Sequence, residues 1–183
     1  MSVTQLEQFY TVASANMQIQ YEINNPYDAF QTGLSNVQPA LWDELMGTMY
    51  ERCYCYAAKV DVEVVNGDSD AVLVTLFPCI NATDISGNIE LMNNQPGVRS
   101  CILGKSGSGK EIGRMSIYAK VRNYYPKISM SNLLCTASAD PTYYLYASLC
   151  GYNVAGSSRV NFHAKVRITF YVNLSRVSLV PES

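Results

Sequence analysis

A stretch near the C-terminus reads Val160-Asn-Phe-His-Ala-Lys-Val-Arg-Ile-Thr-Phe-Tyr-Val172. Every even-numbered residue in it is apolar, and the odd-numbered residues from Asn161 to Thr169 are all polar or charged. Successive side chains of a β-strand point to opposite faces, so a period of two predicts a strand with one face in a core and the other in solvent. This stretch therefore indicates a protein built from half-buried strands.

Similar patterns recur along the rest of the chain. In residues 54–64 every even-numbered residue is apolar, which places Tyr56 on the core face, and Asn66-Gly67 then predicts a turn. Residues 70–77 are apolar on both faces, as in a strand covered on both sides, and Pro78 is expected to end that strand. In all, the sequence predicts strands at 17–23, 54–64, 70–77, 98–103, 115–121, 128–136, 142–150 and 160–172.

One segment, residues 39–50, repeats its apolar residues at helical spacing. These residues are Leu41, Trp42, Leu45, Met46 and Met49. Pro39 suits a first helical turn, so we expect one short inserted helix. Eight strands with one helix favour an all-β, two-sheet antiparallel sandwich over a βαβ fold, whose parallel strands would need regular crossover helices. No internal repeat or linker interrupts residues 1–183, which we expect to form a single domain.

The composition favours a protein that hides surface in an assembly. Charged residues make up 15% of the 183 residues, and the chain has 14 tyrosines. Ordinary soluble domains carry roughly 25% charged residues. Aromatic residues are enriched and charges depleted at interface cores. Self-association is therefore favoured, and a soluble monomer with a surface of Tyr, Ser and Asn is the alternative.

Neither a membrane span nor a secretory signal is expected. No stretch approaches the roughly 18–20 apolar residues of a spanning helix, and residues 1–10 lack a cationic stretch followed by an apolar core. The six cysteines show no C-x-x-C spacing and the chain has one histidine, His163. We therefore expect reduced cysteines that act as small apolar residues, no zinc site and synthesis inside a cell.

The charges are divided unevenly along the chain. Residues 1–98 contain two basic and twelve acidic residues, whereas residues 99–183 contain eleven basic and three acidic residues, for a net charge of −2. Such a division can arise by chance. It is also expected if one surface faces a polyanion and another faces sister subunits.

Several short motifs follow one another along the chain. They are the turn Asn24-Asn-Pro-Tyr-Asp28, the helical Leu41-Trp-Asp-Glu-Leu45, the run Tyr50-Glu-Arg-Cys-Tyr54, the strand 59–64 and the closing Val166-Arg-Ile-Thr-Phe-Tyr-Val172. Their order resembles that of capsid proteins from small circular single-stranded DNA viruses that encode a rolling-circle replication protein, the circovirus-like assemblage. Together the motifs cover most of the chain, although each is short.

The resemblance implies a single eight-stranded jelly roll that self-assembles with icosahedral symmetry around a single-stranded DNA genome. A closed T=1 shell has on the order of sixty equivalent copies. The protein would be a structural component of the virion, made inside the host cell, with nuclear assembly compatible with the family and no cofactor. The sequence departs from the family in one respect, because no basic residue precedes Arg52, where the family carries an arginine-rich arm.

One motif suggests nucleotide binding. Residues 104–111 read Gly-Lys-Ser-Gly-Ser-Gly-Lys-Glu, which meets the G-x-x-x-x-G-K part of a phosphate-binding loop. That site needs Ser or Thr after the lysine and then a helix, but position 111 is Glu and residues 115–121 alternate as a strand. The sequence therefore favours a Gly/Ser loop between two strands.

Basic residues on the polar sides of two strands are candidate nucleic-acid contacts. The candidates are Arg114, Lys120, Arg122, Arg159, Lys165 and Arg167. Alternate residues of a strand point the same way, so each group of three is expected to form a positive stripe, with Tyr118 or Tyr171 available for base stacking. An ordinary polar strand face, or salt bridges to the acidic half of a neighbouring copy, explains the same residues and is slightly favoured.

Other chemistry has weaker support. Nucleophilic catalysis needs a base beside the nucleophile, and His163 lies on a polar strand face, so no catalytic residue is assigned. Asp68 and Asp70 suit a turn better than a calcium site, and no metal is assigned. The remaining alternatives to a DNA-virus capsid are the jelly-roll coat of a small RNA or satellite virus and a non-viral jelly-roll ligand-binding module.

Overall fold

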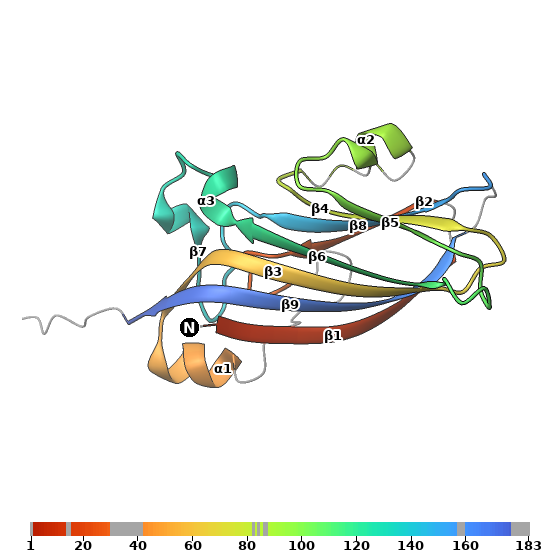
Figure 1. Cartoon of the computed structure of the whole chain (residues 1–183). Coiled ribbons are helices and arrows are strands. Elements are labelled where there is room, and N and C mark those ends of the chain that lie inside the picture. Colours follow the sequence, from red (N-terminus) through yellow and green to blue (C-terminus); the bar gives the residue numbers. More distant parts are fainter. Residues whose placement is uncertain are drawn as a thin grey trace, which may run out of the picture.

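The protein is a sandwich of two antiparallel β-sheets (Figure 1). The computed structural model describes residues 2–13, 16–29, 42–81, 83, 85, 88–156 and 160–176. The first sheet has the order β1 (Ser2–Ala13), β9 (Asn161–Ser175), β3 (Arg52–Asn66) and β6 (Ile112–Lys120), and the short β7 (Leu134–Cys135) also pairs with β3. The second sheet has the order β2 (Asn16–Glu22), β8 (Tyr146–Asn153), β4 (Val72–Cys79) and β5 (Arg99–Leu103).

The connections between these strands define a jelly roll. Only β4 and β5 are neighbours both in sequence and in a sheet, whereas the other principal strands pair with partners far away in the chain. Eight strands that wind back and forth between two sheets are the jelly-roll arrangement of paired Greek keys. The predicted all-β, eight-stranded antiparallel jelly-roll sandwich is confirmed.

The sequence missed one strand and assigned another wrongly. β1 was not predicted, because its pairing register with β9 shifts between Gln5 and Gln8 and this bulge breaks the period of two. The predicted strand 128–136 is mostly a 3₁₀ turn, η2 (Met130–Leu133), followed by β7. Serines favour such turns, and the Oγ atoms of Ser129 and Ser131 lie 2.9 Å apart in a hydrogen bond.

The predicted helix is present but is wound differently. It begins as α1 (Trp42–Glu44) and continues as a π-turn, η1 (Leu45–Met49), while residues 39–41 lie outside the described residues. Trp42 and Met46 are buried as predicted, but the side chain of Met49 is 45% exposed. In the π-turn the Tyr50 N–H donates to the Leu45 carbonyl, five residues back. This wider turn rotates Met49 off the apolar face of the helix.

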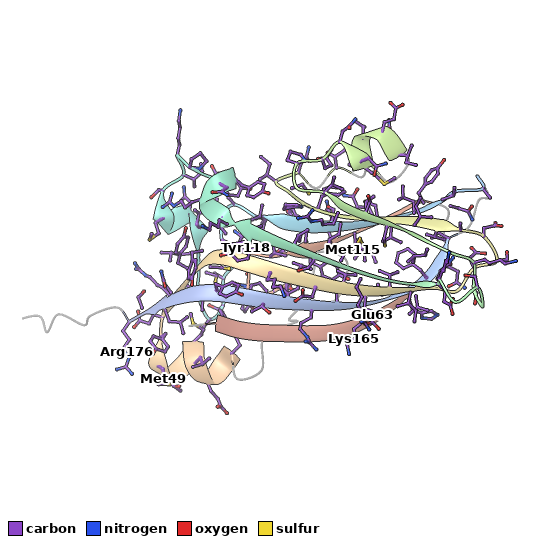
Figure 2. The ribbon with its side chains drawn as sticks, in the orientation of Figure 1. Met49, Glu63, Met115, Tyr118, Lys165 and Arg176 are labelled. Carbon is purple, nitrogen blue, oxygen red and sulfur yellow. The ribbon has the colours of Figure 1, made fainter. Side chains whose placement is uncertain are left out.

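Arg176, beyond the end of β9, holds the end of this π-turn. Its Nε donates to the Met49 carbonyl at 2.6 Å, and its guanidinium lies 6.0 Å from the centre of the Tyr50 ring (Figure 2). Another helix, α3 (Val121–Tyr124), is as short as α1 and η1. None of the described helices is long and apolar enough to cross a membrane.

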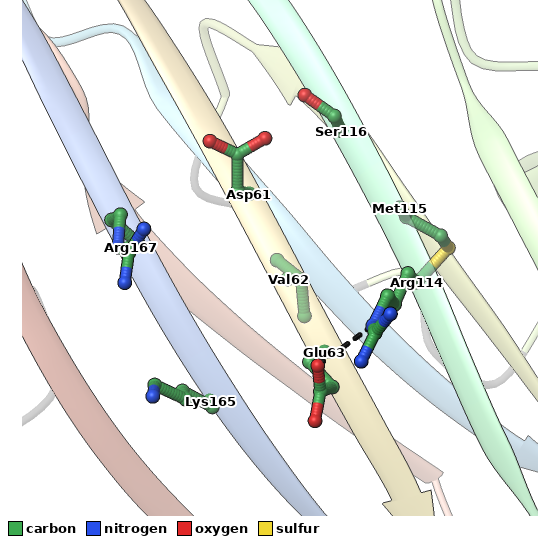
Figure 3. Close-up of a pocket in the computed structure, with 8 residues that line it drawn as sticks. All are labelled: Asp61, Val62, Glu63, Arg114, Met115, Ser116, Lys165 and Arg167. Carbon is green, nitrogen blue, oxygen red and sulfur yellow. Dashed lines mark hydrogen bonds and ion pairs between the residues drawn. The ribbon is translucent and has the colours of Figure 1, made fainter.

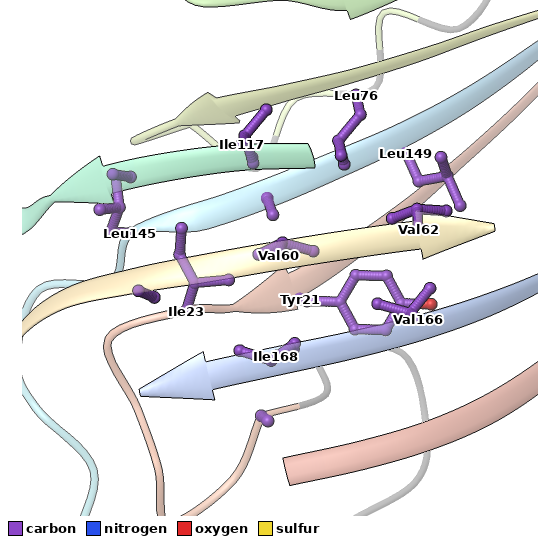
Figure 4. Packing of buried hydrophobic residues seen from close by; sticks show 14 of the residues in the cluster. Tyr21, Ile23, Val60, Val62, Leu76, Ile117, Leu145, Leu149, Val166 and Ile168 are labelled. Carbon is purple, nitrogen blue, oxygen red and sulfur yellow. The ribbon is translucent and has the colours of Figure 1, made fainter. Parts of the chain in front are cut away.

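The core lies between the two sheets. The even-numbered residues of β9 from Phe162 to Val172 are all buried, so the predicted face of this strand is confirmed. Val60 and Val62 of β3 meet Leu76 and Leu149 from the second sheet in this layer (Figure 4). The six cysteines are free thiols. Cys55 is buried, and burial raises the pKa of its thiol, which makes it a small apolar residue of the core.

Pro78 was expected to end its strand, but β4 continues to Cys79. β5 pairs with β4 only as far as Leu76, whereas β8 stays alongside it to Cys79. Pro78 therefore lies where β4 has a partner on one side only, a position at which a missing backbone N–H is tolerated.

The turn after β2 is fixed by two buried asparagines. Asn24 Nδ2 donates to the Tyr143 carbonyl at 2.8 Å, and Asn24 Oδ1 accepts from the Leu145 N–H at 2.7 Å. Asn25 Nδ2 donates to Glu22 Oε2 and to Asp140 Oδ1, both at 2.7 Å. These side chains join the end of β2 to the segment that leads into β8.

We expect Glu22 to give the stability a pH dependence. Burial, with the nearby charges of Asp140 and Asp28, raises the pKa of Glu22 to about 7, although the hydrogen bond from Asn25 opposes the shift. The folded protein therefore retains a proton that the unfolded chain loses above pH 4.5. Stability should fall as the pH rises from 4.5 to 7, by about 1 kcal/mol after allowance for the part of the carboxyl that water reaches.

Urea denaturation of the wild type and Glu22→Gln at several pH values tests this expectation. The variant should match the wild type near pH 4.5 and be more stable at pH 8, because glutamine has no charge to bury. The control Glu51→Gln removes an exposed carboxylate but retains Glu22, so the wild-type dependence should persist. Parallel curves for wild type and Glu22→Gln would contradict the assignment.

The outer faces of the two sheets differ. The helix α2 (Ile89–Asn93) lies over the second sheet and places Met92 against Phe77 and Cys150 in a small cluster (Figure 1). The first sheet instead keeps a row of outward polar side chains exposed on β6 and β9. Four of the six predicted nucleic-acid residues lie on this outer face of the first sheet.

Candidate nucleic-acid interface

Four of the six predicted cationic residues are brought together on one face. Arg114 and Lys120 lie on β6, and Lys165 and Arg167 lie on β9, with β3 between these two strands. All four lie on the polar sides of their strands, opposite the buried residues. The face therefore combines both predicted stripes in a single surface.

The other two candidates are not part of the surface that the structure describes. β6 ends at Lys120, so Arg122 belongs to α3, and its Nη1 donates to the Ile128 carbonyl at 2.7 Å. The prediction that Arg122 extends the strand stripe was wrong, because the chain turns into a helix immediately before it. Arg159 lies outside the described residues.

Acidic residues of β3 separate the two stripes. In the register of the sheet, Glu63 lies opposite both Arg114 and Lys165, and Asp61 lies opposite both Ser116 and Arg167. Arg114 Nε and Glu63 Oε2 form an ion pair at 2.8 Å. The salt bridges considered as an alternative to nucleic-acid binding were expected between neighbouring copies, but this ion pair joins the basic second half and the acidic first half of one chain.

Two carboxylates partly offset the cations at this end of the face. Lys59 Nζ lies 2.9 Å from Asp61 Oδ1. Partial burial opposes ionisation of Asp61, but hydrogen bonds from Lys59 and Ser116 and the charges of Lys59 and Arg167 outweigh it and lower the pKa of the Asp61 carboxyl. A phosphate that approached here would compete with carboxylates already in place.

A shallow hollow of about 360 Å³ lies among these side chains (Figure 3). Its polar lining comes from three neighbouring strands and includes Asp61, Glu63, Arg114, Ser116, Lys165 and Arg167. Both signs of charge line it, so it has no strong preference for an anion.

A cluster of three tyrosines occupies the other end of the same face. The Tyr171 ring centre lies 5.8 Å from that of Tyr118 and 6.3 Å from that of Tyr56. Tyr56 was predicted to face the core, but a bulge between Cys55 and Ala57 turns it outward, and it is 37% exposed. Figure 2 shows Tyr118 at one end of the sheet, and Glu63 and Lys165 at the other.

The other sequence motifs have structural roles. Residues 104–111 form the loop between β5 and β6, as predicted, and the Gly104 N–H donates to the Lys110 carbonyl at 2.9 Å across its base. β6 begins at Ile112, where a phosphate-binding loop would need a helix. His163 is exposed on the polar side of β9. Among the described residues, no group of three or more His, Cys, Asp or Glu side chains is placed to hold a metal ion.

Comparison with known proteins gives only distant matches. No protein family model and no curated protein sequence matches the chain. Similar solved structures include the decameric BFDV capsid protein, with a TM-score of 0.47, 8% identity and coverage of 96% of this chain and 98% of that one.

Two further matches come from other viruses. A chain of desmodium yellow mottle tymovirus has a TM-score of 0.43 and 9% identity over 100% of this chain and 93% of that one. A chain of the T=1 Penaeus vannamei nodavirus has a TM-score of 0.45 and 10% identity over 98% and 61%. At these identities no residue role can be carried over from those proteins to this chain.

Proposed function

We propose that this chain is the subunit of a viral capsid and that its copies assemble into a closed icosahedral shell around nucleic acid. The observation that carries the proposal is the strand order, β1-β9-β3-β6 facing β2-β8-β4-β5. This eight-stranded jelly roll is the architecture of many viral capsid domains. The low charge and the 14 tyrosines agree with extensive contact between copies. The proposed role is structural and involves no catalytic step.

The sequence motifs add detail to this proposal. Their order favours a circovirus-like virus with a single-stranded DNA genome over a small RNA or satellite virus. A T=1 shell of about sixty copies would place every copy in an equivalent position. Within the virion, Arg114, Lys120, Lys165 and Arg167 are the proposed cationic contacts to the genome, and assembly takes place inside the host cell.

Exposed isoleucines mark a candidate contact between copies. Ile102 on β5 is 69% exposed and Ile112 on β6 is 58% exposed. β5 is an edge strand of the second sheet and β6 an edge strand of the first, and the two strands lie in contact. Edge strands present unpaired backbone groups, and exposed apolar side chains there favour association.

We expect Ile102→Asp to abolish particle formation while the subunit remains folded. A charge at this exposed position costs little in the isolated chain but would be buried without a partner in an interface. Sedimentation velocity should show loss of the fast-sedimenting species, and circular dichroism should be unchanged. The control Ile102→Val keeps an apolar, β-branched side chain and should assemble. Normal particles from Ile102→Asp would exclude this edge as a contact.

The proposed function as a whole is tested by negative-stain microscopy and native mass measurement of the purified protein. Closed particles of uniform size are expected. A ligand-binding jelly-roll module is the second candidate, because the hollow on the first sheet is open to solvent and lined by polar groups. A monodisperse monomer or trimer under folding conditions would contradict the capsid proposal and favour that module.

A further inference from the structure

The outer face of the first sheet has two chemically different ends. Along β6, β3 and β9, one row contains Lys120, Ala57 and Tyr171. The next row contains Tyr118, Lys59 and Thr169. Directly opposed residues in a sheet point to the same side. The tyrosine end therefore places two lysines beside aromatic rings, away from Glu63 and Arg114.

The three rings form one continuous surface. Tyr171 is half-buried and contacts both other rings, with Tyr118 at an angle of 72° and Tyr56 at 46°. Tyr118 is the most exposed of the three at 53%. Contiguous exposed aromatic surface of this kind favours a binding site, because binding removes its apolar area from water.

The lysines supply positive charge at the edge of these rings. Lys120 is exposed two residues after Tyr118 on β6, so the two side chains leave the same side of the strand. Lys59 contacts Asp61 through one of the three donors of its ammonium group. Over this part of β3, β6 and β9 there are five cationic side chains, Lys59, Arg114, Lys120, Lys165 and Arg167, against the carboxylates of Asp61 and Glu63. This face therefore carries an excess of positive charge, although the chain as a whole has a net charge of −2.

We propose that Tyr56, Tyr118, Tyr171, Lys59 and Lys120 form a platform for single-stranded nucleic acid. Unpaired bases stack on the rings, of which Tyr118 is the most accessible, and the two lysines contact the adjacent phosphates. An aromatic surface with flanking cations on a β-sheet binds single strands in this way, because every base has a flat face and each phosphate carries a charge. A duplex offers phosphates but no free base faces.

This inference rests on the proposed function and specifies it further. If the chain forms a shell around the genome, the face that binds nucleic acid must line the interior of the shell. The outer face of the first sheet would then face inward. The second sheet, covered in part by α2, then lies toward the exterior. The end around Asp61 and Glu63 contributes less, because both carboxylates lie there and would repel a phosphate.

Binding of fluorescently labelled oligo(dT) to unassembled protein tests the platform. Tyr118→Leu retains an apolar side chain but removes the aromatic face, and we expect about tenfold weaker binding, since one base stacked on an aromatic ring contributes roughly that factor. Lys120→Gln should weaken binding and reduce the slope of log affinity against log salt by about 0.7. Oligo(U) in parallel reports whether RNA is bound equally well.

Matched controls separate stacking from charge and from folding. Lys105→Gln removes a cation from the exposed loop between β5 and β6 and should change affinity less than Lys120→Gln. Tyr143→Leu alters an exposed tyrosine outside the platform and should leave binding unchanged. A DNA duplex should bind Tyr118→Leu and wild type equally. Circular dichroism of each variant verifies the fold.

The outcomes distinguish this inference from the capsid proposal. Wild-type affinity for oligo(dT) in folded Tyr118→Leu and Lys120→Gln overturns the platform, even if particles form. Loss of particles in Tyr118→Leu with unchanged oligo(dT) binding also overturns it and makes the face a contact between copies. Weaker oligo(dT) binding in these variants supports the platform even if the wild type never assembles, a result that would refute only the capsid proposal.

Discussion

Replacing Asn24 by alanine is expected to lower the free energy of unfolding by about 3 kcal/mol, because a buried backbone amide and a partly buried backbone carbonyl lose their partners at once. The Leu145 N–H and the Tyr143 carbonyl both bond to the Asn24 side chain, at 2.7 Å and 2.8 Å. Leu145 is fully buried, so water cannot easily replace the amide. The substitution also frees the segment before β8 from the end of β2.

Urea denaturation of the unassembled protein measures this effect as a lower midpoint with an unchanged slope. The control Asn123→Ala removes an exposed asparagine from α3 and should change stability by less than about 0.5 kcal/mol. If both variants unfold at the wild-type midpoint, the two hydrogen bonds of Asn24 do not stabilise the fold.

A methyl group added at Gly151 is expected to destabilise the protein by about 1–3 kcal/mol through overpacking. Gly151 lies on β8, and its Cα faces the Phe162 ring of β9 across the sandwich. A Cβ at this position would lie 3.2 Å from Phe162 Cδ1 and Cζ, and closer still to Cε1. Both residues are buried, so the ring has little room to move.

A double-mutant cycle tests this cause. Phe162→Leu leaves room for the methyl group, so Gly151→Ala should cost less in that background, with a coupling of about 1 kcal/mol. Gly67→Ala is a control, because its Cβ would make only ordinary contacts at 3.4 Å or more with Asn161. Equal costs of Gly151→Ala in both backgrounds would show that the ring is not the obstacle.

The regular strands could be predicted because their signal is local. In β6, in β9 and in β3 from Ala58 onward, the residues alternate between core and solvent, and burial follows that alternation in the structure. Bulges removed the signal elsewhere. One bulge hid β1, and another turned Tyr56 from the predicted core face to the surface.

The candidate site was only partly predictable. Each basic stripe was visible, because residues two apart on a strand share a side. In the structure β3 lies between the two stripes, and Glu63 faces Arg114. This arrangement depends on sheet pairing between residues 51 positions apart in the chain. Pairing over such distances leaves no local pattern, so the compensation of charge was not predicted within one subunit.

The sequence by itself determined the class of fold, the strand faces of β6, β9 and the part of β3 beyond its bulge, and the cations of β6 and β9, since period-two alternation is a property of neighbouring residues. Tertiary structure decided which strands are neighbours, and therefore which charges are neutralised and which stay available. It joined Tyr56, Tyr118 and Tyr171, from three separate strands, into one surface beside two lysines. The physical reason is that hydrogen bonding between distant strands fixes their register, and register alone sets which side chains meet.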